Sequence, residues 1–127
     1  MLKSLAIAGA GGFIGTVARL LIFKYFQTSV SSVFPWSTLV VNVLGCLLIG
    51  IIYGISEREE IFSPDVRLFL TVGICGGFTT FSTFSNDALM LIRQQEWFRF
   101  ALYASLSLFA GLVAVYLGRL VPNIIRL

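Results

Sequence analysis

Residues 36–56, WSTLVVNVLGCLLIGIIYGIS, form a run of 21 residues without one charged side chain. A helix rises about 1.5 Å per residue, so about 20 residues cross a bilayer core of about 30 Å. Two further uncharged runs of similar length follow, at residues 68–86 and 100–118, and an apolar, glycine-rich segment precedes them at residues 5–26. We therefore predict one all-α membrane domain over residues 1–127, with four transmembrane helices at about these spans: 4–26, 36–56, 67–92 and 100–119.

The composition argues against an enzyme. The chain is 57% hydrophobic and 12% charged, whereas soluble domains average roughly 45–50% and about 25%. It has no histidine, so a histidine-based triad, an imidazole proton relay and a histidine-ligated metal site are excluded. Cys46 and Cys75 stand singly in apolar runs, so they form no disulfide scaffold and no CxxC metal motif. We expect no enzymatic activity, no organic cofactor and no nucleic-acid partner.

The first span has one competing interpretation. Residues 1–15 combine a basic Lys3, an apolar stretch and small residues, as a cleaved signal peptide does. The apolar character continues to Phe26, however, which is long for a signal peptide. We therefore interpret it as a transmembrane helix that carries Arg19 at depth and Lys24 near its end, where a lysine can snorkel to the interface.

The basic residues give almost no bias in orientation. With four crossings, the N-terminus, the 57–67 loop and the C-terminal tail share one side, which carries five of them: Lys3, Arg58, Arg67, Arg119 and Arg126. The other side carries three, or four if Arg19 faces it: Lys24, Arg93 and Arg99. Because Lys/Arg asymmetry sets orientation, two hypotheses stay open. Oppositely oriented copies form an antiparallel homodimer, or the small bias suffices for one topology.

Small residues recur at four-residue spacing in every span. The pairs and the ladder are these: Gly11/Gly15, Gly50/Gly54, Gly73/Gly77 and Ala110/Ala114/Gly118. Such positions let helix backbones approach closely in lipid, and they indicate close helix contacts without giving a number of subunits.

The third span concentrates the polar chemistry, in residues 73–87, GICGGFTTFSTFSND. The pair Gly76-Gly77 lies mid-membrane, where glycine can release a helix from regular geometry. A break would free carbonyl oxygens, which suit a hard cation such as Na⁺. The alternative is close helix packing at the two glycines without a break, and spacing alone favours it.

The residues after the glycines predict a lined pathway. Residues three apart are neighbours on a helix, which places an aromatic and a polar stripe side by side: Phe78, Phe81 and Phe84, and Thr79, Ser82, Thr83 and Asn86. Other spans add further hydrogen-bond donors: Asn42, Tyr103, Ser107 and Arg19. The spans contain no acidic residue except Asp87, near the end of the third, so a buried proton relay is missing. A lining of donors and positive ring edges suits a small anion better than a cation.

The segment at residues 76–85, GGFTTFSTFS, resembles the third-helix signature of the Fluc (CrcB) fluoride channels. Residues 15–19, GTVAR, and residues 36–45, WSTLVVNVLG, support the resemblance, which covers essentially the whole chain. One position departs from the pattern, because Asp87 stands where many members have the longer glutamate.

The resemblance implies a passive, selective fluoride channel in a bacterial-type cytoplasmic (inner) membrane. It implies an antiparallel dual-topology homodimer with two pores, a central structural Na⁺ and a third helix broken near Gly76-Gly77. The edges of the Phe81 and Phe84 rings would line the pores, with these further pathway residues: Asn42, Ser82, Thr83, Tyr103 and Ser107. The carbonyls of Gly76 and Thr79 would hold Na⁺, and Arg19 would lie near the aqueous vestibule.

Two alternatives remain beside this interpretation. A small dual-topology multidrug exporter has the same length, but it needs a carboxylate in the first helix, where this chain has Arg19. A non-transporting assembly or scaffold subunit would use the glycines to pack against partners. That hypothesis leaves the Thr/Ser/Phe run unexplained, and it predicts that Phe81→Ile and Phe84→Ile are silent.

Overall fold

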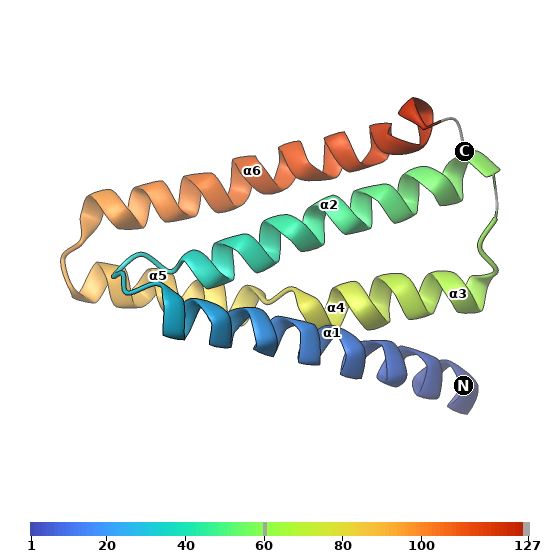
Figure 1. Ribbon diagram of the computed structural model, residues 1–127, viewed down its shortest axis with the longest axis horizontal. Coiled ribbons are helices and arrows are strands. Elements are labelled where there is room, and N and C mark those ends of the chain that lie inside the picture. Colours follow the sequence, from blue (N-terminus) through green and yellow to red (C-terminus); the bar gives the residue numbers. More distant parts are fainter. Residues whose placement is uncertain (60, 126–127) are drawn as a thin grey trace.

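The computed structural model describes residues 1–59 and 61–125, without the side chains of residues 58 and 59. In this part of the chain every regular element is a helix (Figure 1). In chain order they are α1 (Leu2–Ser29), α2 (Trp36–Glu59), α3 (Pro64–Leu68), the π-helix η1 (Phe69–Cys75), α4 (Gly76–Phe78), α5 (Phe81–Arg93) and α6 (Trp97–Ile124).

Four helical stretches are long and apolar enough to cross a membrane. They are Leu2–Ser29, Trp36–Glu57, Pro64–Arg93 and Trp97–Ile124, and the third joins α3, η1, α4 and α5. The chain is therefore an all-α, multi-pass integral membrane protein, as the uncharged runs predict.

The helices pack in two close pairs, α2 along α6 and α1 along η1 and α4. Glycines lie at both contacts. A Cβ atom at Gly11 would lie 2.5 Å from the Phe69 carbonyl oxygen, and one at Gly118 would overlap the backbone of Leu47. Because no side chain fits at these points, the backbones meet directly. The small-residue spacings of the sequence thus mark real helix contacts.

The third span is interrupted in its middle. Thr79 (φ −87°, ψ 158°) and Thr80 (φ −152°, ψ 111°) are extended between α4 and α5. Gly76 itself is helical, with φ −62° and ψ −38°. Gly77 serves close packing, because a Cβ there would lie 2.5 Å from the Gly12 carbonyl oxygen. The helix is therefore broken near the glycine pair, as predicted, but the broken residues are the two threonines that follow it.

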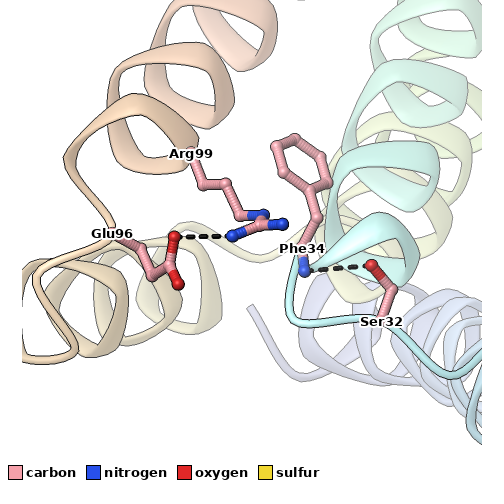
Figure 2. Close-up of polar contacts among 4 residues, drawn as sticks. All are labelled: Ser32, Phe34, Glu96 and Arg99. Carbon is pink, nitrogen blue, oxygen red and sulfur yellow. Dashed lines mark hydrogen bonds and ion pairs between the residues drawn. The ribbon is translucent and has the colours of Figure 1, made fainter.

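Two connections meet at one end of the bundle (Figures 1 and 2). After α5 the chain turns at Gln95 (φ 58°), and Arg99 pairs with Glu96 at 2.6 Å. Opposite them, the Phe34 N–H donates to Ser32 Oγ at 3.2 Å. The Phe34 ring joins a buried cluster completed by Leu39, Ala88, Leu91 and Tyr103. This cluster packs α5 against α2 and α6.

The start of α1, the end of α2 and the end of α6 lie at the opposite end of the bundle (Figure 1). Two exposed ion pairs lie there, Lys3–Asp65 at 2.9 Å and Arg119–Glu57 at 2.7 Å. Arg126 and the side chain of Arg58, which enter the charge count for this side, lie outside the described residues.

Candidate ion pathway at the helix break

The side chain of Asn42, on α2, holds the break in the third span. The Thr80 N–H donates to Asn42 Oδ1 at 2.8 Å, and Asn42 Nδ2 donates to the Thr80 carbonyl oxygen at 3.2 Å. Two bonds to one residue satisfy an extended backbone that would otherwise lack partners inside a membrane. Asn42 thus has a structural task in addition to the pathway role that the sequence predicts.

The break leaves backbone carbonyls without their helical donors. In an unbroken helix, Gly76 and Thr79 would accept from the N–H groups of Thr80 and Thr83. Here the Thr80 N–H is taken by an amide side chain, and the Thr83 N–H donates to Thr80 Oγ1 at 3.2 Å. Within residues 1–59 and 61–125, neither carbonyl has another donor. Carbonyl oxygens of this kind are ligands for hard cations.

Arg19 bonds the carbonyl that lies between these two. Its Nε donates to the Gly77 carbonyl oxygen at 3.0 Å, and its guanidinium carbon lies 5.9 Å from the centroid of the Phe23 ring. In an unbroken helix the Phe81 N–H would donate to the Gly77 carbonyl oxygen. Because Phe81 begins the next helix, Arg19 supplies the donor instead. Arg19 therefore links α1 to the break, and the vestibule role stays a prediction.

A cavity of about 470 Å³ lies beside the break. Its lining includes six of the predicted site residues: Asn42, Gly76, Thr79, Phe81, Phe84 and Ser107. The remaining lining residues are Gly45, Cys46, Ile49, Thr71, Cys75, Thr80, Ala104 and Leu108. Residues far apart in the sequence thus meet at one surface, which is mostly apolar with a few polar groups, as ligand sites are.

The hydroxyl of Ser107 is the unusual group in this cavity. Its Oγ is buried and has no hydrogen-bond partner among the described residues. A buried polar group without a partner is rare, and a bound ligand or ion is one explanation. The two phenylalanines of the cavity lie close together, since the centroids of the Phe81 and Phe84 rings are 5.8 Å apart. Phe81 as a residue is 78% exposed.

Tyr103, one helical turn before Ser107, is fully buried and is not among the residues that line the cavity. Its ring is 5.1 Å from that of Phe84, and its hydroxyl donates to Asp87 Oδ2 at 3.2 Å. The same oxygen accepts a hydrogen bond from Thr38 Oγ1 at 2.8 Å. Asp87 therefore ties α2, α5 and α6 together, which the sequence did not reveal.

Ser82 and Thr83 lie on the first turn of α5, next to the cavity lining. The hydroxyl of Thr80, the residue before that turn, donates to Thr83 Oγ1 at 3.1 Å and lies 3.3 Å from Ser82 Oγ. Thr80 is the N-cap of α5, a role for which threonine is favoured. Sequence reasoning missed Thr80, although a threonine before a helical turn is the ordinary signal of a cap.

The chain is similar in sequence to known proteins over most of its length. Residues 6–119 match the family described as CrcB-like protein, Camphor Resistance (CrcB). A fluoride-specific ion channel FluC from Flavobacterium psychrophilum is 40% identical over 96% of this chain and 98% of its own length. A protein of the same name from Phocaeicola vulgatus is 44% identical over 92% of this chain and 96% of its own length. One from Chlorobium luteolum is 45% identical over 91% of this chain and 88% of its own length. The chain that folds around this broken helix therefore belongs to the CrcB-like protein family.

Proposed function

We propose that the protein is a passive, fluoride-selective channel of the cytoplasmic (inner) membrane, without catalytic activity. The observation that carries the proposal is the Ser107 hydroxyl, which has no hydrogen-bond partner in the part of the chain that the structure describes. Ser107 lines a cavity together with Phe81, Phe84 and Asn42. The names of the relatives supply the identity of the ion, since those proteins are called fluoride-specific ion channels.

The cavity has the chemistry of an anion path. Hydroxyl groups donate hydrogen bonds, aromatic ring edges are electropositive, and the positive end of α5 begins at Phe81. No acidic side chain lines the cavity within the described residues. A small, strongly hydrated anion must exchange its water for closely spaced donors. A donor such as Ser107, which has no partner within residues 1–59 and 61–125, can make this exchange.

The exposed break supports assembly as an antiparallel homodimer. Irregular backbone is tolerated at membrane depth only where protein or water covers it. Gly76, Phe81 and Ser82 are exposed in the single chain, near the middle of the span Pro64–Arg93. A second copy on this face would cover them and complete two pathways. The free carbonyls of Gly76 and Thr79 from both copies would then hold a central Na⁺, which would neutralise the facing carbonyl dipoles.

The test is ion efflux from liposomes that contain the purified protein, with fluoride and chloride followed by electrodes. We expect fast loss of fluoride, no loss of chloride and at least a tenfold slower fluoride loss for Phe81→Ile. Phe109→Ile is the matched control, because Phe109 is an exposed phenylalanine of α6 outside the cavity lining. A folded protein that passes no fluoride would instead favour the scaffold interpretation.

A further inference from the structure

One face of α2 contacts both threonines of the break. The Asn42 side chain is hydrogen-bonded to both the N–H and the carbonyl oxygen of Thr80, at 2.8 and 3.2 Å. Gly45 lies three residues later, hence on the same helix face. A Cβ atom at Gly45 would overlap Thr79 Cγ2 and would lie 3.4 Å from Phe78 Cδ2. The absence of a side chain at this position lets the break approach α2.

The Thr79 methyl group cannot turn aside freely. Threonine is stiff at χ1, and Thr79 Oγ1 donates to the Cys75 carbonyl oxygen at 3.0 Å. The Thr79 N–H donates to that same oxygen, also at 3.0 Å. Rotation of the side chain would break the hydroxyl bond inside the membrane. A larger residue at position 45 would therefore displace Thr79 together with its backbone.

We propose that Gly45 is a positioning residue for ion passage. Because it has no side chain, it sets how closely Thr79 packs against α2. The proposal rests on the proposed function and adds a residue to it. Displacing Thr79 moves its free carbonyl and strains the two bonds between Asn42 and Thr80, which caps the first turn of α5. The ring of Phe81 on that turn would shift with it. Gly45 thus acts through other groups and needs no contact with the ion.

The first experiment compares fluoride efflux of Gly45→Ala with that of Gly9→Ala, in liposomes at equal amounts of folded protein. A Cβ at Gly9 would meet no atom within 4 Å, so this control should match the wild-type rate. We expect Gly45→Ala to lower the rate at least tenfold. An equal rate for both variants would overturn the proposal.

The second experiment removes the methyl group that a Cβ at position 45 would meet. Thr79→Ser keeps the hydroxyl that bonds Cys75 but lacks Cγ2. The double variant Gly45→Ala/Thr79→Ser is compared with Thr79→Ser alone. We expect its fluoride efflux rate to be less than threefold lower, whatever the effect of Thr79→Ser itself. A loss as large in this background as in the wild type would contradict the contact. If Gly45→Ala alone fails to fold, recovery of folded protein in the double variant supports the proposal, and failure of both overturns it.

A third readout is independent of transport. The Thr80 amide is hydrogen-bonded to Asn42, so its hydrogen exchange, followed by NMR, reports on the break. We expect the Thr80 amide to exchange at least ten times faster in Gly45→Ala than in the wild type. In the double variant, its exchange rate should be close to that of Thr79→Ser alone. If the wild type passed no fluoride, the proposed function would fail while this measurement still tested the contact. Unchanged exchange in Gly45→Ala would refute the positioning role.

Discussion

The bond between Arg19 and Gly77 can be separated from the charge of Arg19 by two substitutions. In Arg19→Gln, the glutamine Nε2 stands as many bonds from Cα as the arginine Nε, so it can still donate to the Gly77 carbonyl oxygen. In Arg19→Lys, a methylene group takes that place, and the charge is kept one bond further out. If Arg19 stabilises the protein through this hydrogen bond, Arg19→Gln should lower the free energy of unfolding less than Arg19→Lys. If only its charge matters, Arg19→Lys should lower it less.

The size of the effect follows from the geometry. The Nε–oxygen distance is 3.0 Å, and a hydrogen bond that involves a charged group contributes about 1.5–3 kcal/mol. Losing the bond leaves the Gly77 carbonyl without its helical partner, because Phe81 begins a new helix. We expect Arg19→Lys to lower the free energy of unfolding by about 2 kcal/mol, which is about 30-fold in the unfolding equilibrium. For Arg19→Gln, which keeps a neutral bond, we expect a loss of about 1 kcal/mol.

The assay is reversible unfolding in mixed micelles by a denaturing detergent, followed by the fluorescence of Trp36 and Trp97. Lys24→Gln is the control, since Lys24 lies on the same helix, is exposed and has no side-chain partner among the described residues. It should change the free energy of unfolding by less than about 0.5 kcal/mol. If Arg19→Lys proves as stable as the wild type, or more stable than Arg19→Gln, the bond does not stabilise the break and the reasoning fails.

Two further substitutions test the packing and the buried carboxylate by the same unfolding assay. Gly15→Ala would place a Cβ over the carbonyl of Ile74, so we expect a loss of about 1–3 kcal/mol, with Gly9→Ala near neutral; equal stability of the two would contradict the close contact. Asp87→Ala leaves the buried hydroxyl of Thr38 and a tyrosine hydroxyl without their acceptor and should cost about 2–4 kcal/mol. Asp87→Asn keeps an acceptor oxygen and should cost clearly less; the opposite order would show that the charge matters more than the bonds.

The sequence alone determined the features that depend on local composition. Uncharged runs of about 20 residues define membrane spans wherever they occur, because the cost of burying charge in lipid does not depend on the rest of the fold. The glycine spacings marked helix contacts for a similar reason, since close approach in lipid requires small residues. The signature around Phe81 and Phe84 correctly predicted the family. Six of the residues predicted with it line one cavity, and their roles in ion passage remain predictions.

The tertiary structure decided where the helix breaks and which polar groups face the cavity. The break lies at Thr79 and Thr80 because Asn42, 38 residues from Thr80, supplies both a donor and an acceptor there. Tyr103 and Ser107 share one helix face by spacing, yet Asp87 binds the tyrosine hydroxyl and leaves only the serine in the cavity. Such outcomes depend on which hydrogen-bonding partner the fold places next to each polar group. A membrane interior offers no water to replace a missing partner. Periodicity along one helix carries no information about those distant partners.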